Sequence, residues 1–444
     1  MPYKYSGKKI LILGIGLTGV SCINFFLKKG AIPKIIDESK KPDYLNKIPK
    51  NIKYKLGGLE KKWILESDLI IISPGISSFK PILMEARMLG IEIISDIELF
   101  AREAKSPIIS ITGTNGKSTV ATMVKKIATK SGYKAYLIGN IGFPVLNILE
   151  KKADLYILEL SSFQLENIFS LKSKISVVLN INEDHLDRYP NGFKQYKKIK
   201  LSIYKNSEIC LVNLKEKIYF FKNKQKKYIT FGTDDSDYYI KHIKGKHFLY
   251  CRKEKIIDTS KTLLYGYQNY ENALVALAIS DMMGFPRNVT KDVLRNFVNL
   301  PHRFQIVHQH NNISWINDSK STNVNSTKTA LENIQTQGTI WLLLGGDKKS
   351  ADFNILKNYL EKLKIKIYCF GKDGINISKI CKKKSIYVRY LTDAMILISK
   401  KVKPSDVVLL SPGCSSTDQF KNFEERGNLF IKLSKEISSC FQKK

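Results

Sequence analysis

Residues 112–119, with the sequence Thr-Gly-Thr-Asn-Gly-Lys-Ser-Thr, restrict the fold of this chain more than any other segment. They follow the apolar run 107–111, which predicts a buried strand, and they lead into residues 119–130, which have the spacing of a helix. A glycine-rich turn between a strand and a helix lets backbone N–H groups approach a phosphate, and the helix N-terminus favours its negative charge. In such a loop Lys117 is expected to reach the β- and γ-phosphates and Ser118 to bind Mg²⁺. The segment predicts a nucleotide-binding α/β unit.

The spacing of this loop departs from the standard phosphate-loop pattern. Ile111 stands five residues before Gly116, where the pattern has its first glycine. The alternative is an ordinary strand–turn–helix junction with a lysine at its mouth. The strand–loop–helix context and the Gly-Lys-Ser-Thr ending favour the phosphate loop.

A second glycine-rich turn, residues 14–19, fits the pattern G-x-G-x-x-G after a short apolar run, and Asp37 ends the next predicted strand. Taken alone, this pattern predicts a dinucleotide site. It specifies only a diphosphate at a helix N-terminus, so a nucleotide sugar satisfies it equally well, and simple tight packing of the turn is a further alternative. Because no second substrate site with a hydride partner is evident, we favour a diphosphate ligand other than NAD.

Alternating strand-like and helix-like segments predict an α/β fold in three domains. We expect a Rossmann-like domain at residues 1–95, a central phosphate-loop domain at 96–300 with a parallel sheet plus antiparallel strands, and a Rossmann-like domain at 301–444. The polar residues 97–106 are interpreted as a linker, and residues 209–257 as antiparallel hairpins. Buried strands are predicted at 9–13, 33–37, 69–73, 91–95, 107–111, 155–160, 176–180, 314–317, 340–344, 365–370 and 406–410. Helices are predicted from the first glycine turn to residue 27 and at 81–89, 119–130, 269–283 and 291–297.

The net charge of +33, from 73 basic and 40 acidic residues, makes a nucleic-acid ligand one hypothesis. Only nine of the basic residues are Arg, the residue suited to bidentate contact with phosphates and bases, and the lysines are scattered along the chain. We therefore expect no dedicated nucleic-acid surface, but a diffuse field that attracts anionic small molecules.

The seven cysteines form no CxxC pair and their number is odd, so we expect neither a disulfide framework nor a structural zinc site. No apolar run reaches the ~20 residues needed to span a bilayer, and the first residues lack the pattern of a signal peptide. These features together predict a protein of the reducing cytoplasm.

Two polar clusters follow predicted strands of the central domain. Glu159 ends one strand, and residues 183–187, Glu-Asp-His-Leu-Asp, follow the next. The carboxyl ends of parallel strands meet at one sheet edge, so both clusters are expected near the phosphate loop. Mg²⁺ needs few protein ligands besides water, and Ser118, Glu159 and one residue of the second cluster, with His185 favoured, would suffice. The alternative for the outer acids of that cluster is a solvated or helix-capping role.

Seven segments together resemble the Mur ligase family, and they extend from the phosphate loop to residue 427. The segments are 112–119, 158–166 (LELSSFQLE), 182–189 (NEDHLDRY), 300–304 (LPHRF), 317–323 (NDSKSTN), 344–352 (LGGDKKSAD) and 410–427 (LSPGCSSTDQFKNFEERG). With the N-terminal glycine turn, the resemblance covers nearly the whole chain. Residues 161–166, 350–353 and 418–427 resemble the branch that adds D-glutamate, and the Asn-Pro-Arg motif of the branch that adds a diamino acid is absent.

This resemblance implies an ATP-dependent ligase that adds D-glutamate to UDP-N-acetylmuramoyl-L-alanine during peptidoglycan precursor synthesis, through an acyl phosphate and a tetrahedral intermediate. It implies ATP and Mg²⁺ at two sites as cofactors. We expect a monomer that neither binds nucleic acid nor inserts into a membrane.

The resemblance also assigns roles to individual residues. It implies catalytic roles for Lys117, His185 and Lys200, and metal binding by Ser118, Glu159, His185 and Lys200 as a carbamate. The implied ATP contacts are Gly113, Thr114, Asn115, Gly116, Lys117, Ser118, Thr119, Asn269, Asn272, Arg303 and Asp318. The implied contacts of the UDP-linked substrate are Gly14, Gly16, Leu17, Thr18 and Asn140. Those of D-glutamate are Lys320, Thr322, Lys349, Ser416 and Phe423.

One departure concerns the uracil end of the substrate. After the second strand the family typically has Thr-Arg, whereas here Asp37 is followed by Glu38 and Ser39. Lys40 or Lys41 is the replacement we would test first.

Three alternatives remain open at this point. A folylpolyglutamate synthetase shares the ATPase unit but lacks an N-terminal nucleotide-sugar domain, which residues 1–95 argue against. A basic phosphate-loop ATPase acting on nucleic acid would show DNA-stimulated ATP hydrolysis. A regulatory dinucleotide sensor would bind NAD and hydrolyse nothing.

Overall fold

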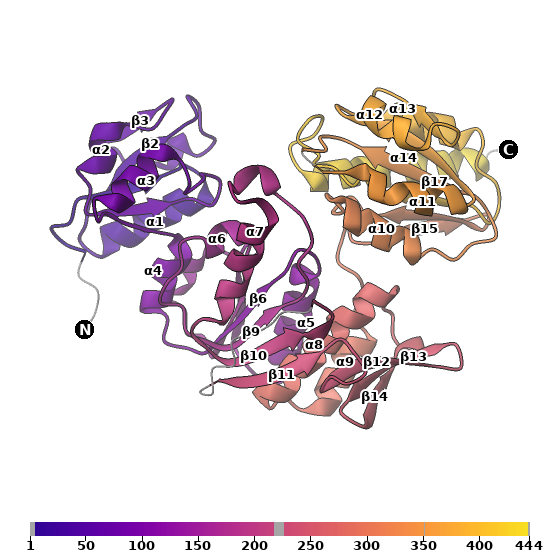
Figure 1. Cartoon of the computed structure of the whole chain (residues 1–444), viewed down its shortest axis with the longest axis horizontal. Coiled ribbons are helices and arrows are strands. Elements are labelled where there is room, and N and C mark those ends of the chain that lie inside the picture. The colour runs from indigo at the N-terminus through magenta and orange to yellow at the C-terminus, as the bar shows by residue number, and fades with distance from the viewer. Residues whose placement is uncertain (1–4, 217–225, 350, 443–444) are drawn as a thin grey trace. The chain divides into compact units, whose positions relative to one another are not determined.

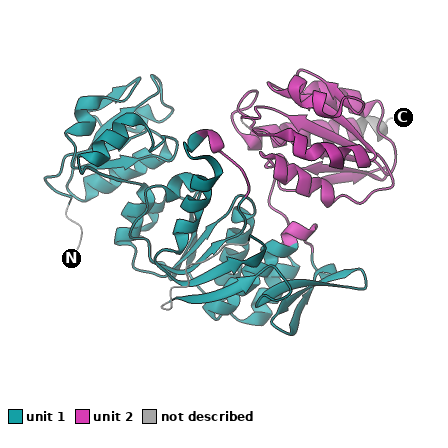
Figure 2. Cartoon of the chain, viewed as in Figure 1, with its two compact units in different colours: residues 1–181, 188–262, 270–296 teal, residues 182–187, 263–269, 297–444 magenta. Residues whose placement is uncertain are grey.

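The computed structural model describes residues 5–216, 226–349 and 351–442, and the side chains only to residue 438. Ser350, which begins the segment 350–353 discussed above, and Cys440, one of the seven cysteines, lie outside these limits. The described chain is α/β, as predicted, with three sheets (Figure 1). It divides into two compact units (Figure 2). Unit 1 comprises residues 1–181, 188–262 and 270–296, and unit 2 comprises residues 182–187, 263–269 and 297–444.

The first sheet of unit 1 is fully parallel, with the strand order β3-β2-β1-β4-β5. Its strands are β1 (Ile10–Leu13), β2 (Lys34–Asp37), β3 (Tyr54–Leu56), β4 (Leu69–Ile72) and β5 (Glu92–Ile94). Its helices are α1 (Leu17–Lys28), α2 (Lys61–Leu65) and α3 (Pro81–Met88). Alternate residues of β1 bury on opposite faces, Ile10 and Ile12 with α1, and Leu11 and Leu13 with α2 and α3. This two-sided burial explains why β1 is apolar throughout.

The second sheet of unit 1 has the order β14-β13-β12-β11-β10-β9-β6-β8-β7. It is parallel from β7 to β12 and antiparallel from β12 to β14. Its strands are β6 (Ile108–Thr112), β7 (Ala135–Gly139), β8 (Leu155–Glu159), β9 (Ser173–Val178), β10 (Ser207–Asn213), β11 (Lys227–Phe231), β12 (Tyr238–Ile243), β13 (Lys246–Cys251) and β14 (Glu254–Asp258). The helices packed with it are α4 (Asp96–Glu103), α5 (Lys117–Lys130), α6 (Ser162–Leu165), α7 (Gly192–Leu201), α8 (Tyr267–Met283) and α9 (Arg287–Arg295).

The sheet of unit 2 has the order β15-β16-β20-β17-β18-β19 and is parallel except for the pair β15–β16. Its strands are β15 (Gln305–His310), β16 (Ile313–Asn317), β17 (Ile340–Gly345), β18 (Ile365–Phe370), β19 (Ser385–Tyr387) and β20 (Val407–Leu410). Its helices are α10 (Val324–Glu332), α11 (Lys357–Lys362), α12 (Gly374–Ser378), α13 (Leu391–Ser399) and α14 (Phe423–Gln442). Leu342 and Trp341 of β17 bury in different core clusters, so this sheet also has helices on both faces.

The prediction of a linker at residues 97–106 is wrong, because α4 occupies most of it. Ser95 caps this helix by accepting a hydrogen bond from the Glu98 N–H, and Leu99 and Phe100 are fully buried. The buried Glu98 carboxylate accepts hydrogen bonds from Arg102 and from the N–H groups of residues 169 and 170. These bonds allow a charged helix face to be buried, which the polar composition concealed.

The prediction of hairpins at 209–257 is only partly right. The pairs β12–β13 and β13–β14 are antiparallel, but β10 and β11 are parallel to β9 and continue the main sheet. Four strands, β3, β7, β15 and β19, were not predicted, and all four lie at sheet edges. β3 and β19 have only three residues and β15 carries polar residues, whereas β7 is an apolar strand that was overlooked. Helix α9 begins four residues before the predicted start at 291.

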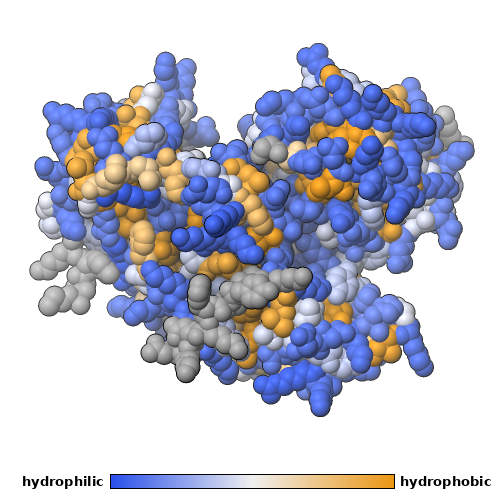
Figure 3. Space-filling model, viewed as in Figure 1, coloured by the Kyte–Doolittle hydropathy of each residue, from blue (hydrophilic) through white to orange (hydrophobic). Residues whose placement is uncertain are grey.

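The surface and the thiols agree with a globular chain. On the face shown in Figure 3, hydrophilic residues predominate and apolar residues form scattered patches. All six cysteines of the described part are free thiols. Within the same part, no helix is both long enough and apolar enough to cross a bilayer.

Candidate active site

The phosphate loop joins the end of β6 to the start of α5. Gly116 is the N-cap of α5 with φ +86°, a conformation that L-residues rarely adopt. A Cβ at this position would lie 2.4 Å from Oδ1 of Asn272, so the loop and α8 approach as closely as glycine permits. The first N–H groups of α5 have no carbonyl partner within the helix and face the loop. This is the local structure that the motif predicts.

Asn180, which follows β9, holds this loop in place. Its backbone oxygen accepts a hydrogen bond from the Thr114 N–H at 2.9 Å, and its side-chain Oδ1 accepts one from the Asn115 N–H at 2.8 Å. Its Nδ2 donates to the Asn115 carbonyl at 3.1 Å. Asn180 is the last residue of the strand predicted at 176–180, and no role was predicted for it. An amide directly after a strand of the phosphate-loop sheet was the available signal.

Two lysine amines lie against the backbone of the loop. Lys117 Nζ donates to the carbonyl oxygens of Gly113 and Thr114 at 2.8 and 2.9 Å. Lys200 Nζ, from the end of α7, donates to the Gly113 oxygen at 2.9 Å, and its side chain is only 2 % exposed. Tyr196 lies beside both elements, because its ring is 4.8 Å from Lys200 Nζ and its hydroxyl is 3.0 Å from Thr114 Oγ1. The structure therefore brings Lys117 and Lys200 together.

Glu159 has the surroundings of a metal ligand. It ends β8 beside Ile111 of β6, and its side chain is fully buried. Its Oε1 accepts a hydrogen bond from Nδ2 of Asn140 at 2.8 Å, whereas its buried Oε2 has no hydrogen-bond partner among the described residues. A buried carboxylate oxygen without a partner is costly unless a cation or a donor meets it.

These donors fit Mg²⁺, which takes oxygen ligands and keeps several waters. The Ser118 hydroxyl in the first turn of α5 is buried, as expected for a ligand that faces the loop. No group of three or more His, Cys, Asp or Glu side chains gathers within the described ranges, so water and phosphate oxygens would complete the coordination. Asn140 was predicted as a contact of the UDP-linked substrate, and the structure adds that it orients Glu159.

The predicted turn after β1 is also formed. A Cβ on Gly19, in α1, would lie 2.0 Å from the carbonyl oxygen of Gly14, so the helix packs directly on the turn. The N–H of Ile15 donates to Oδ2 of Asp37 at 2.5 Å, and Leu17 is 52 % exposed at the sheet edge. Asp37 thus supports the turn here, at the position where a dinucleotide-binding protein uses a carboxylate for ribose.

Several predicted ATP contacts lie outside the loop. Asn272 is close to Gly116, as described, and Asn269 lies one turn earlier on α8, where its Nδ2 donates to the Tyr265 oxygen at 2.8 Å. In unit 2, Asp318 follows β16 and accepts hydrogen bonds from Ser321 and Ser411 and from the Phe304 N–H. Burial raises the pKa of this carboxyl to about 6 despite these donors. Arg303 lies next to Phe304, and its charge lowers the pKa of Asp318 slightly.

His185 also belongs to unit 2. Its backbone has φ +53°, its Nε2 lies 3.6 Å from Oδ1 of Asp184, and its Nδ1 lies 3.2 Å from Nζ of Lys349. Lys349 follows β17 and is exposed. The metal-binding role of His185 stays a prediction.

The residues predicted to bind D-glutamate gather where β16, β20 and β17 end. Lys320 Nζ lies 3.6 Å from the ring centre of Phe423, at the start of α14. The buried Arg426 ties this start to the strand ends, because its guanidinium donates to Oγ and O of Ser319 and to the Cys414 oxygen. Ser416 is buried in the adjacent loop, which pairs with Asp347. Thr322 lies in the loop after β16, partly buried.

Arg426 is a cation that sequence analysis missed. Burial lowers its pKa to about 10, since no carboxylate contacts it directly in the described part of unit 2. A buried guanidinium next to the Lys320 and Ser416 loops adds positive charge where a dicarboxylic amino acid is expected. Residues 418–427, which contain Arg426, were noted only as a segment that resembles the family, and Arg426 was given no role of its own.

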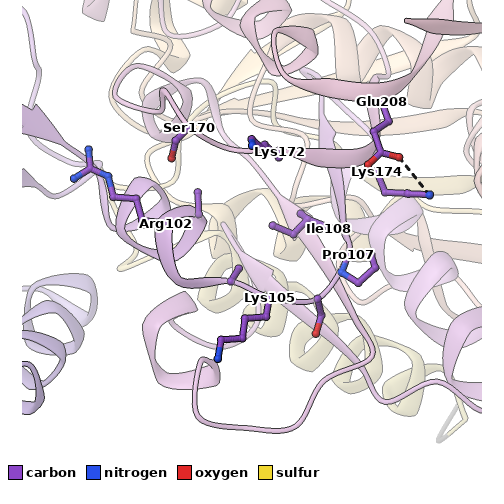
Figure 4. A pocket seen from close by; sticks show the side chains of 11 residues that line it. Arg102, Lys105, Pro107, Ile108, Ser170, Lys172, Lys174 and Glu208 are labelled. Carbon is purple, nitrogen blue, oxygen red and sulfur yellow. Dashed lines mark ion pairs between the residues drawn. The ribbon is translucent and has the colours of Figure 1, made fainter. Parts of the chain in front are cut away.

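A separate pocket of about 470 Å³ opens at the opposite edge of the second sheet (Figure 4). It lies beside the starts of β6, β9 and β10 and is lined by Lys105, Lys172, Lys174 and Glu208, of which the last two form an ion pair at 3.3 Å. The phosphate loop follows the other end of β6. The pocket is therefore not part of the site described above.

The fold and this site define a phosphate-loop enzyme of the α/β class that activates a substrate with a nucleoside triphosphate. Three family descriptions match consecutive parts of the chain: "Mur ligase MurD-like, N-terminal domain" at residues 8–95, "Mur ligase middle domain" at 111–280 and "Mur ligase, glutamate ligase domain" at 302–414. The chain belongs to the Mur ligase family, and it is an ATP-dependent ligase.

Relatives and a solved structure agree with this family. The chain is 72 % identical over 440 residues to the UDP-N-acetylmuramoylalanine–D-glutamate ligase of Buchnera aphidicola subsp. Schizaphis graminum. The aligned residues cover 99 % of this chain and 100 % of the relative. It is 45 % identical over 434 residues to the enzyme of the same name from Escherichia coli strain 536, with 98 % and 99 % covered. The fold matches the MurF ligase of Thermotoga maritima with a TM-score of 0.64, at 16 % identity and 98 % coverage of both chains.

Proposed function

We propose that this chain joins D-glutamate to the alanyl carboxylate of UDP-N-acetylmuramoyl-L-alanine, with ATP converted to ADP and phosphate, in the synthesis of peptidoglycan precursors. Relatives at 45–72 % identity over the full length carry the name of this activity. The observation that supports the chemistry is that β6, which leads into the phosphate loop, has buried groups on both sides: Glu159 Oε2 lies at the end of the neighbouring strand β8, and Lys200 Nζ donates to the Gly113 oxygen of the loop.

Amide formation from a free carboxylate needs activation, because its oxygen is a poor leaving group. Transfer of the γ-phosphoryl group to the carboxylate gives an acyl phosphate, which the amine of D-glutamate attacks through a tetrahedral intermediate. Such a transfer depends on positioning and on neutralising charge. Lys117 and the first N–H groups of α5 bind the phosphates, while Asn180 and Gly116 fix the loop.

Mg²⁺ at this site would supply positive charge to the phosphates and orient them. We propose two such ions, held by Ser118, Glu159, His185 and a carbamate on Lys200. Carbamylation turns the amine into an anionic oxygen ligand, which is the change that a buried lysine among metal ligands needs.

The remaining predicted contacts are part of the proposal. The UDP-linked substrate is bound by Gly14, Gly16, Leu17, Thr18 and Asn140. ATP is contacted by residues 113–119, Asn269, Asn272, Arg303 and Asp318. D-Glutamate is bound by Lys320, Thr322, Lys349, Ser416 and Phe423. We also propose domain limits at 95 and 300, a monomeric state and a cytoplasmic location.

A panel of amino acids tests the substrate assignment. The protein is mixed with ATP, Mg²⁺ and UDP-N-acetylmuramoyl-L-alanine, and phosphate release is measured with each amino acid in turn. We expect release to depend on D-glutamate and on the UDP-linked substrate together. Release that shows no preference for D-glutamate would overturn the assignment.

A further inference from the structure

Arg188 and Glu166 form a buried ion pair that no role above explains. Arg188 ends the short 3₁₀ turn Leu186–Arg188, three residues after His185, and Glu166 directly follows α6. The guanidinium Nε and Nη2 donate to the two carboxylate oxygens at 2.7 and 2.9 Å. The two side chains are only 9 % and 1 % exposed. The pair thus has the planar two-bond geometry that arginine, unlike lysine, provides.

The same pair holds a loop of the first sheet. Arg188 Nη1 donates to the carbonyl oxygen of Pro74 at 2.9 Å, and Nη2 donates to that of Ile76 at 3.0 Å. The Ser78 hydroxyl donates to Oε2 of Glu166 at 2.8 Å. Three hydrogen bonds to one ion pair therefore fix segment 74–78 to the part of unit 1 that contains the second sheet.

This segment borders the turn predicted for the diphosphate. It follows β4, which pairs with β1, and the N–H of Ser73 donates to the Leu13 oxygen. A Cβ on Gly14 would lie 2.7 Å from the Ser73 hydroxyl and 3.6 Å from Cδ1 of Ile76, so segment 74–78 lies against the turn. The order β3-β2-β1-β4-β5 reverses direction between β1 and β4, and open α/β sheets bind their ligands at the carboxyl side of that point.

We propose that Arg188 and Glu166 are positioning residues for the UDP-linked substrate. They fix segment 74–78 beside the 14–18 turn, and they hold it against the chain segment that leads from Glu159 to Glu166. The nucleotide end of the substrate and its reacting carboxylate are thereby kept in register. This inference rests on the function proposed above, and it assigns a role to two residues that touch neither substrate in that account.

The test separates this role from simple stabilisation. In E166L/R188M both charges are replaced by apolar side chains of similar size, so no unpaired buried charge is left, and such exchanges are often neutral for folding. The bonds to the Pro74 and Ile76 oxygens are lost all the same. R188K keeps the positive charge at this position, but an ammonium group cannot make the four directed hydrogen bonds that the Arg188 guanidinium makes. R287K is the matched control, because Arg287 forms a two-bond pair with Asp281 elsewhere in unit 1.

Binding of UDP-N-acetylmuramoyl-L-alanine and of ATP is measured separately by calorimetry on each full-length protein, together with thermal unfolding. We expect both Arg188 variants to bind the UDP-linked substrate at least about tenfold more weakly, since small misplacements of positioning groups have effects of that size or more. ATP affinity should stay within about twofold of wild type, and R287K should match wild type for both ligands.

Three results would contradict the proposal. Unchanged affinity for the UDP-linked substrate in E166L/R188M and R188K would show that the pair is dispensable for positioning. Equal loss of affinity for both ligands would show a general structural role. If the wild-type protein itself does not bind UDP-N-acetylmuramoyl-L-alanine, the substrate assignment fails, and the positioning role fails with it.

Discussion

Lys200 is the residue whose chemistry the structure constrains most. Its amine is buried against the Gly113 oxygen at the end of α7, while its neighbour Lys198 is exposed. If a carbamate on Lys200 supplies a metal ligand, K200A should lower the rate of ligation by about 100-fold or more, the size of effect seen when a group that stabilises transition-state charge is removed. Small carboxylates such as acetate should restore part of the activity, because they can occupy the vacated anionic position.

The matched control for this prediction is K198A, which removes a lysine from the same helix without touching the loop. It should keep wild-type activity, since exposed charges far from the site contribute little. Ligation assays with and without acetate compare the three proteins. An active K200A protein would contradict the carbamate role.

The sequence indicated Glu159 and Lys200 through motif spacing and resemblance, but not the contacts that fix them. Asn140 was assigned to substrate, and its bond to Glu159 became visible only when β7 and β8 were paired. Arg426 and Asn180 each bind a residue far away in the sequence: Arg426 donates to Ser319, and Asn180 accepts from Asn115. Hydrogen bonds of this kind depend on which strands are neighbours, and that order is not encoded in local patterns.

Asp318 gives a prediction about pH. Burial raises its pKa to about 6, whereas the unfolded chain has a value near 3.9. Between these two values the folded protein holds a proton that the unfolded chain releases, so this group's contribution to stability falls as pH rises from about 4 to about 6. The stability of wild type relative to D318N should decrease over that window by up to about 3 kcal/mol and be constant above it.

Urea unfolding of wild type and D318N, followed at several pH values between 4 and 7.5, measures this difference. Asp96, whose pKa burial also raises to about 6, is present in both proteins and cancels. A difference that does not change with pH would show that the hydrogen bonds from Ser321 and Ser411 already compensate for the burial of the charge.

At the scale of elements, α5 shows how a glycine can serve ligand binding. Gly116 and Gly132 flank this helix with φ +86° and +90°, but only a Cβ on Gly116 would collide, with Asn272. G116A should therefore lose about 1–2 kcal/mol of stability from its backbone conformation and, in addition, displace the loop and weaken ATP binding. G132A should have a similar backbone cost and leave ATP affinity unchanged, because nothing lies within 4 Å of its Cβ.

Calorimetric titration with a non-hydrolysable ATP analogue and thermal unfolding of the two variants separate these effects. If G116A and G132A bind the analogue equally well, the close approach of α8 to the loop is not important for the nucleotide site.

Elements with strong patterns could be predicted from the sequence, and those stabilised by distant partners could not. The apolar runs of β1, β4, β6 and β17 are buried on both faces, so their composition alone identified them. Helix α4 was missed because its buried face includes Glu98, whose carboxylate accepts hydrogen bonds from N–H groups 71 and 72 positions away. The parallel pairing of β10 and β11 was missed because short apolar and aromatic runs separated by turn residues have the pattern of hairpin strands, whichever way they pair.

At the scale of the whole molecule, net charge is the property that bears on function. The proposed substrates, ATP and a UDP-linked sugar acid, are strongly anionic, and the chain carries 33 more basic than acidic residues. Scattered lysines produce a long-range field rather than specific contacts. The field should aid capture of the substrates but not the chemical step, whose groups are buried, as Glu159 and Lys200 are.

Salt dependence tests this division. Raising ionic strength from about 10 to about 100 mM shortens the screening length from roughly 30 to roughly 10 Å. We expect kcat/KM for ATP and for the UDP-linked substrate to fall at least about threefold over this range, while kcat at saturation stays nearly constant, because electrostatic steering acts on encounter. Low-salt solutions whose viscosity is matched to that of the salt solutions with sucrose serve as the control for slower diffusion.

The same assay distinguishes a general cationic field from a nucleic-acid surface. Duplex DNA, as a polyanion, should compete weakly at low salt and lose its effect near 100 mM, because scattered lysines release few counterions at any one place. It should never stimulate phosphate release. Stimulation by DNA would mean that the lysines form an organised surface and that the ATPase serves nucleic acid. A kcat that falls with salt as steeply as kcat/KM would mean that surface charge acts on the chemical step after all.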